Sequence, residues 1–238
     1  MKAKLNNFVV LDCETGGLDR KNQEHARLVP MTEIAMIGVS ADNFHEFGRY
    51  VSKIKGQEID GEYVGYDPSL VYQPEALKFT GTTISMIERD GKTLKEVVAN
   101  MIEIFKITKT GSHFHKPIIV GHNVTYDIPF IQHAFDLMGE DLSKYVSGWK
   151  DQNRTFQPHF IDTMWMSRQK WAEEGMKHTL SDLCGRLGVD LFDAHGALSD
   201  TVATLECFKK MTIGIRTGEM HIGEINQGVE RTRDTFEI

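Results

Sequence analysis

The sequence predicts an α/β domain in which helices flank a mixed β-sheet. Apolar runs of strand length come first, at residues 7–12, 33–39 and 44–51, with short connections between them. Beyond residue 83, strand-like and helix-like segments alternate along the chain. Strands that pair locally, followed by strands separated by helices, are typical of a mixed sheet covered by helices.

The first three strands are expected to form an antiparallel meander. Residues 7–12, 33–39 and Phe44–Val51 follow one another closely, and the third run is broken by Gly48. Short connections of this kind favour antiparallel pairing. The following stretch, 53–74, is polar and contains glycine. It therefore predicts a loop or an insertion.

Helical spacing begins at Thr83 and is clearest from Leu94. Apolar residues there recur three and four positions apart, which predicts one buried helix face. Its members are Leu94, Val97, Val98, Met101, Ile102 and Phe105. Residues 117–121 then predict a short buried strand. The helix expected after it has a core face of Ile128, Ile131, Phe135 and Met138.

The last part of the predicted domain repeats this alternation. Residues 160–163 predict one more short strand. A helix is expected over Thr179–Gly188, because Thr179 and Asp182 have the spacing of a capping box. The last helix is expected from Ala197 to Met211. This organisation predicts a catalytic domain over 1–211 with an insertion near 53–72, followed by a tail of unknown role, 212–238.

Composition limits the classes of partner. The chain of 238 residues has the apolar and charged fractions of a soluble globular protein and a net charge of −7. An acidic balance argues against tight nonspecific binding of nucleic acid, which relies on a basic surface. It allows an enzyme that holds a few nucleotides at an acidic cleft filled with cations.

The cysteines and the apolar runs predict a cytoplasmic location. Cys13, Cys184 and Cys207 are scattered and include no Cys-x-x-Cys pair, which favours a reducing compartment. No apolar run approaches the roughly 18–20 residues that span a bilayer, and the first residues lack a secretory signal. No membrane partner is expected.

Asp12 and Glu14 are the first candidate site residues. They end the apolar run 8–11 and are followed by Thr15-Gly16-Gly17-Leu18. Residues two apart on a strand point to the same face, so both carboxylates project from one side. Two like charges held this close repel unless a cation lies between them. Oxygen ligands suit hard divalent ions such as magnesium or manganese, whereas the alternative is an acidic turn that caps the next element.

Three further residues are candidates because of their positions. Asp127 falls in the first turn of a helix, just beyond a strand, at the sheet edge where α/β proteins place ligands. Asp200 lies on a helix face of small residues, with the large Leu205 and Phe208 expected on another face. The face of small residues would allow Asp200 to lie against a sheet edge or a bound ion. The alternative is that Asp200 is a surface carboxylate on a neutral face. His195, five residues earlier, has the pKa range of a general base.

Taken in order, three motifs resemble those of the DEDDh 3′–5′ exonucleases. This superfamily includes the proofreading epsilon subunit of bacterial DNA polymerase III, ribonuclease T and oligoribonuclease. The matching segments are Asp12-x-Glu14-Thr15-Gly16-Gly17-Leu18, Gly121-His122-Asn123-x-x-x-Asp127-x-x-Phe130-Ile131 and Ala194-His195-x-Ala197-Leu198-x-Asp200. The resemblance covers residues 7–211.

The resemblance implies a ribonuclease-H-like fold and a site that holds two divalent metal ions, Mg²⁺ or Mn²⁺. It implies that Asp12, Glu14, Asp127 and Asp200 are the metal ligands and that His195 is the general base. The implied reaction removes nucleoside 5′-monophosphates from a 3′ end by the two-metal scheme. The residues implied to contact substrate are Thr15, Gly16, Leu18, His122 and Asn123.

Departures from the family pattern leave the substrate open. Gly196 stands where the histidine motif usually has arginine, and the segment 73–82 lacks the histidine of polymerase-type members. We expect action on the 3′ ends of single-stranded DNA, with RNA as the alternative and a DNA polymerase as a candidate partner. Trp149, Trp165 and Trp171 could stack on bases or simply pack. The alternative of another class is an inactive nucleic-acid-binding or polymerase-docking module.

Overall fold

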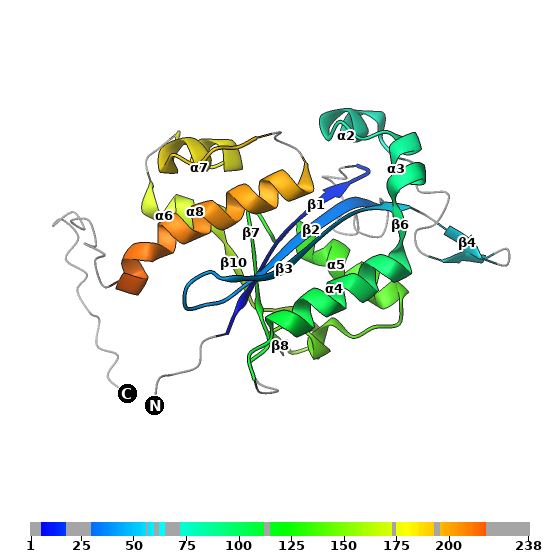
Figure 1. The fold of residues 1–238 in the computed structure, drawn as a ribbon, viewed down its shortest axis with the longest axis horizontal. Helices are drawn as coiled ribbons and strands as arrows, with labels where there is room; N and C mark the ends of the chain where they lie inside the picture. The colour runs from blue at the N-terminus through cyan, green and yellow to red at the C-terminus, as the bar shows by residue number, and fades with distance from the viewer. Residues whose placement is uncertain are drawn as a thin grey trace.

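The computed structural model describes residues 6–17, 30–55, 57–59, 62–64, 72–111, 115–172, 175–192 and 196–217. A six-stranded sheet runs through them in the order β10-β7-β1-β2-β3-β6 (Figure 1). Its strands are β1 (Phe8–Thr15), β2 (Met31–Val39), β3 (Glu46–Lys55), β6 (Lys92–Thr93), β7 (Ile118–Gly121) and β10 (Phe160–Asp162). The predicted α/β class is confirmed.

Helices cover both faces of this sheet. The helices α4 (Leu94–Thr108) and α5 (Asp127–Leu137) lie on one face, and α8 (Ala197–Thr217) crosses the other (Figure 1). Two shorter helices, α6 (Thr163–Lys170) and α7 (Leu180–Leu187), pack against α8. The other elements are α2 (Pro74–Phe79), α3 (Ile84–Asp90), the 3₁₀ turn η1 (Leu142–Lys144), and two hairpins, β4 (Gln57–Ile59) with β5 (Glu62–Val64) and β8 (Gly148–Lys150) with β9 (Phe156–Pro158).

The predicted antiparallel meander is confirmed. β2 pairs antiparallel with both β1 and β3, whereas β7 pairs parallel with β1 and β10. β7 pairs only with residues 8–10 of β1, so the second half of β1 extends beyond β7. This overhang leaves one edge of β1 open at the carboxyl end of the parallel strands.

The alternation of side chains along β1 divides the core into two layers. Val9 and Leu11 pack with the buried residues of α4 and α5. Val10 points the other way and packs with Leu205 and Phe208 of α8. Because strand side chains alternate, the even-numbered residues after Val10 also face α8. The two predicted carboxylates of β1 are therefore on the α8 side of the sheet.

Two segments differ from the prediction. β3 continues to Lys55, and its residue Ile54 is buried at 1% exposure. The strands β4 and β5 and the start of α2 also fall within the stretch 53–74, which was expected to be a loop or an insertion. α8 continues past Met211 to Thr217. Beyond Met211, the side chain of Ile213 is 61% exposed, so it adds nothing to the buried apolar pattern that predicted the helix. Among the described residues, no helix is both long and apolar enough to cross a membrane.

Local signals set three of the helix ends. The capping box predicted for α7 is present: the amide of Asp182 donates to Thr179 Oγ1, and Asp182 Oδ2 accepts from the amide of Thr179. The same helix ends at Gly188, whose φ of 59° is left-handed and suits glycine. α4 begins with a second capping box, formed by Thr93 and Glu96. These ends are therefore fixed by sequence as well as by packing.

Gly38 allows α4 to approach β2 closely, and replacing it tests this packing. A Cβ at Gly38 would collide with Thr108 Oγ1, whereas one at Gly185, in α7, would meet nothing within 4 Å. We expect Gly38→Ala to lower the free energy of unfolding by about 1–3 kcal/mol through overpacking. Gly185→Ala should raise it by up to about 1 kcal/mol because alanine is the better helix former. Urea unfolding of both variants checks this, and equal effects would contradict it.

Candidate active site

Three of the four predicted acids form one cluster. Ligand oxygens of Asp12, Glu14 and Asp200 all lie within 4.8 Å of one another. Asp12 and Glu14 project from the α8 face of β1, and Asp200 comes from the first turn of α8. All three residues are partly exposed. The cluster is thus built by one strand and one helix, and Glu14 and Asp200 are 186 positions apart in the sequence.

α8 reaches this position because it is buried along two faces. The small residues Ala203 and Cys207 pack against α7, and Thr201 Oγ1 lies 3.5 Å from the carbonyl oxygen of Ala35 in β2. Leu205 and Phe208, which were expected on another face of this helix, pack onto the sheet beside Val10. Both contact surfaces fix the start of α8, and with it Asp200, against β1.

Asp127 lies beside the cluster and is held by β1. Its Oδ1 accepts hydrogen bonds from the backbone N–H of Cys13 at 3.1 Å and from Cys13 Sγ at 3.0 Å. β7 ends before this point, so the carboxylate takes the place of a strand partner for the Cys13 amide. As the first residue of α5, Asp127 also benefits from the helix dipole. Its role as a metal ligand stays a prediction.

Burial and mutual repulsion raise the pKa values of these acids. Burial first, and then the charges of Asp127, Glu14 and Asp200, raise the pKa of Asp12 well above its usual range. Burial, Asp200 and Glu33 raise the pKa of Glu14 to about 8. Burial raises the pKa of Asp127 to about 7 despite its hydrogen bonds from Cys13. A cation at this position would relieve the repulsion that these shifts express.

The donor set fits a hard divalent ion. The cluster offers carboxylate oxygens, without a cysteine or histidine among its members. Magnesium and manganese prefer such ligands, whereas zinc and copper sites normally include nitrogen or sulfur. The chemistry of these residues therefore supports the divalent metal dependence predicted from sequence.

A glutamate and a lysine that the sequence did not single out extend the cluster across the sheet. Glu33 of β2 pairs directly with Glu14, and Lys53 of β3 pairs directly with Glu33. Lys53 Nζ lies 3.0 Å from Glu33 Oε2, and it also donates to Thr82 Oγ1 at 3.3 Å. The lysine lowers the pKa of Glu14 and so opposes the surrounding acids. The pairing of these three strands brings Glu33 and Lys53 close to Glu14, and the sequence alone does not give that pairing.

The turn after β1 is clamped on three sides. Thr15 Oγ1 lies 3.2 Å from the hydroxyl of Tyr126, and the amide of Gly16 donates to the carbonyl of Pro30 at 2.7 Å. The carbonyl of Gly16 in turn accepts from the amide of Gln73 at 2.6 Å. A side chain at Gly16 would approach Tyr72 to 2.8 Å, so only glycine fits without displacement. The predicted substrate contacts of Thr15 and Gly16 thus lie on a fixed turn at the edge of the cluster.

His122 and Asn123 lie in the turn that joins β7 to α5. Both ring nitrogens of His122 have partners, Thr163 Oγ1 and the carbonyl of His178, each at 3.0 Å. Asn123 has a left-handed φ of 62°, and its amide donates to Asp162 Oδ1 at 2.9 Å. Asp162, another residue missed from the sequence, therefore holds this turn in place. Substrate contact by His122 and Asn123 stays a prediction.

Two of the predicted site residues lie outside the described residues. These are His195, the predicted general base, and Leu18, the predicted apolar contact to the terminal nucleotide.

Comparison with known proteins identifies the class of this chain. A family model for exonucleases, named for ribonuclease T, matches residues 9–208. The chain belongs to this exonuclease family, which confirms the resemblance to DEDDh exonucleases and the enzyme class, a hydrolytic nuclease. Ribonuclease T of Shewanella denitrificans is 34% identical over 144 residues, which cover 57% of this chain and 55% of that protein.

Two further similarities extend over nearly the whole chain. The PolC-type DNA polymerase III of Staphylococcus aureus is 27% identical over 222 residues, which are 92% of this chain and 12% of the polymerase. E. coli exonuclease I in complex with a dT13 oligonucleotide has a TM-score of 0.62 and 20% identity, covering 90% of this chain and 42% of that one. The ribonuclease-H-like fold is thereby confirmed. The chain spans about half or less of the length of each of these relatives.

The raised pKa values predict that the metal-free protein loses stability as pH rises. Unfolded carboxylates titrate near pH 4, so between about pH 4.5 and 8 the folded site retains protons that the unfolded chain has released. Stability should therefore fall across this window, and Glu14, with a folded pKa of about 8, contributes to the fall up to that pH. Thermal unfolding in EDTA from pH 5 to 8.5 checks the direction.

The variant Glu14→Gln provides the comparison for this pH dependence. It removes one titrating group, so its melting temperature should decline less over the same pH range. Magnesium should raise the melting temperature of the original protein most at pH 8. A wild-type curve no steeper than that of Glu14→Gln would contradict the shifted pKa of this residue.

Proposed function

We propose that this chain is a metal-dependent 3′–5′ exonuclease that acts on single-stranded ends, with DNA favoured over RNA. The observation that supports this best is the cluster of Asp12, Glu14 and Asp200 within 4.8 Å, inside the segment that the exonuclease family model matches. Carboxylates that repel one another so strongly destabilise the folded protein when no cation is bound, which favours a role in holding cations.

Each site residue has a proposed task. Asp12, Glu14 and Asp200, with Asp127 beside them, hold two divalent ions, Mg²⁺ or Mn²⁺. Bound there, such ions supply Lewis acidity and neutralise the charge that develops on the phosphate. The backbone at Thr15 and Gly16 positions the terminal nucleotide, with Leu18, His122 and Asn123 completing its surroundings. His195 accepts the proton of the attacking water.

The proposed substrate follows from the relatives and from the chemistry of the sugar. Two proteins similar to this chain point to different nucleic acids. One is a ribonuclease, and the other is an exonuclease I in complex with a dT13 oligonucleotide. DNA and RNA differ by a 2′-hydroxyl, and discrimination depends on contacts to that group. We retain RNA as the second candidate. Docking on a DNA polymerase stays a prediction prompted by the similarity to part of a PolC-type polymerase.

We further propose a cytoplasmic location. Cys13, Cys184 and Cys207 are all free and buried. The sulfur atoms of Cys184 and Cys207 lie only 3.6 Å apart without a bond. Three cysteines without a disulfide suit a reducing compartment.

Removal of one carboxylate tests the proposed reaction. We expect Asp12→Ala to lower turnover by at least about 10³-fold, since a lost ligand disturbs the metal ions on which the chemistry depends. The same variant should melt at an equal or higher temperature in EDTA, because a repelling charge has been removed. The assay follows 5′-labelled DNA and RNA strands of one sequence with magnesium, manganese or EDTA.

The control for this variant is Asp136→Asn, which changes an exposed carboxylate of α5. It should retain the full rate and the ladder of products shortening from the 3′ end. Equal rates of Asp12→Ala and the control would refute the metal assignment. An absence of degradation in every metal would favour the inactive binding module instead.

His195→Ala tests the proposed general base. If His195 accepts the proton of water, activity should fall most near neutral pH and recover partly as hydroxide concentration rises. The rate of release of the first nucleotide between pH 6 and 9.5 measures this profile. A loss of the same size at every pH would assign His195 to positioning of the substrate.

A further inference from the structure

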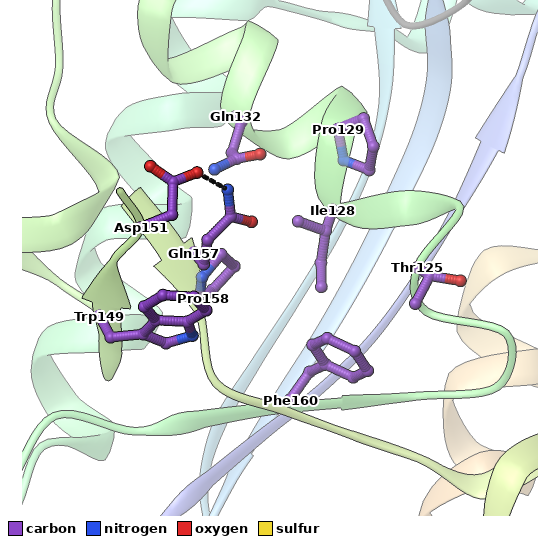
Figure 2. A pocket seen from close by; sticks show the side chains of 9 residues that line it. All are labelled: Thr125, Ile128, Pro129, Gln132, Trp149, Asp151, Gln157, Pro158 and Phe160. Carbon is purple, nitrogen blue, oxygen red and sulfur yellow. Dashed lines mark hydrogen bonds between the residues drawn. The ribbon is translucent and has the colours of Figure 1, made fainter. Parts of the chain in front are cut away.

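A pocket of about 430 Å³ lies apart from the carboxylate cluster, between α5 and the hairpin β8–β9 (Figure 2). Its walls come from α5 and the turn before it, from both hairpin strands and from Phe160 of β10. Pockets for small ligands commonly have such volumes and combine apolar walls with a few placed polar groups. Nothing in the reaction proposed above uses this pocket.

The pocket shares one turn of backbone with the active site. Tyr126 and Asp127 point from this turn toward β1, where they contact Thr15 and Cys13. Thr125 and Ile128, the residues on either side of that pair, line the pocket. The same turn therefore supplies residues both to the active site and to the pocket.

Aromatic rings form one side of the pocket. Trp149 is 55% exposed, which is high for such a large apolar side chain. Phe160 lies near it, held edge-to-face against Trp165 with ring centroids 5.7 Å apart. Figure 2 shows both rings below Ile128 and Pro129 of α5. Flat aromatic surfaces open to solvent are suited to stacking with the bases of a single strand.

Two glutamines give the pocket its polar character. Gln157 Nε2 donates to Asp151 Oδ2 at 3.1 Å, and Gln132 Nε2 donates to the carbonyl of Phe156 at 3.0 Å. Both partners only accept hydrogen bonds, so each amide nitrogen must face its partner and each amide oxygen must point elsewhere. Figure 2 places the amide oxygen of Gln157 on the side toward Ile128.

The charge of the lining decides between possible ligands. None of the nine described lining residues is a lysine or arginine, and Asp151 is acidic. A phosphate or an acidic peptide would therefore meet repulsion. A neutral base with an exocyclic amino group would instead find a hydrogen-bond acceptor in the amide oxygen of Gln157.

We infer that this pocket binds a nucleobase upstream of the 3′-terminal nucleotide and favours bases that carry an exocyclic amino group. The inference rests on the proposed function, since it assigns a second contact to the same single strand. Stacking on Trp149 provides the affinity, and the amide oxygen of Gln157 provides the preference. The pocket thus makes the rate depend on bases that are not yet being removed.

The test uses single-stranded DNA with one altered position. Adenine, nebularine (which lacks the amino group) or an abasic site is placed second, third or fourth from the 3′ end, and KM and kcat for release of the terminal nucleotide are measured. At one of these positions the abasic site should raise KM about tenfold, the scale of one lost stacking contact. Nebularine there should raise KM a few-fold.

Variants connect these effects to the pocket. Trp149→Ala should remove the sensitivity to the abasic site, and Gln157→Leu should remove the difference between adenine and nebularine. Neither should change kcat at saturation. The control Phe47→Ala changes an exposed aromatic residue of β3, far from the pocket in the strand order, and should retain both effects. Uniform KM at all three positions, or sensitivity that survives in Trp149→Ala, would overturn the inference.

A binding measurement separates this inference from the proposed function. In EDTA, Asp12→Ala should show quenching of tryptophan fluorescence by oligo(dA) that is largely lost when Trp149→Phe is added. This readout works even if the enzyme degrades nothing, so a failed reaction and a failed pocket give different results. Quenching by an acidic peptide, with no response to oligo(dA), would also overturn the inference.

Discussion

Three carboxylates held within 4.8 Å of one another are the constraint on which the rest of this structure depends. Such groups repel, so the scaffold has to keep them together. β1 is paired on both sides over its first half, and α8 is buried against both the sheet and α7. The two elements that carry the carboxylates are therefore among the most firmly packed in the domain.

Neighbouring groups stabilise some of the acids around the cluster more than others. Asp127 is stabilised by the amide and thiol of Cys13, whereas Glu33 is balanced by Lys53 at 3.0 Å. Among the described residues, no hydrogen bond or ion pair of this kind reaches the side chain of Asp12 or Glu14, although the charge of Lys53 lowers the pKa of Glu14. Burial and the neighbouring acids outweigh this and raise the pKa of Glu14 to about 8. The negative potential is thus concentrated where cations are expected to bind.

Much of this arrangement could be predicted from sequence because it follows from local periodicity. The alternation in β1, the apolar face of α4 and the capping box of α7 each depend on residues close together in the chain. α6 and the hairpin β8–β9 were missed because they are short and lack a clear apolar period. Glu33 and Lys53 could not be placed beside Glu14 without the register of three strands.

The alternation of β1 also protects the domain from a specific folding error. A shift of one residue in the pairing of β1 would exchange its two faces. Asp12 and Glu14 would then enter the apolar layer of α4 and α5, which now receives Leu11 and Cys13. Charges buried there without partners are too costly to persist. The acids that serve the site therefore also select the correct pairing while the chain folds, so a mispaired sheet cannot accumulate as a stable inactive form.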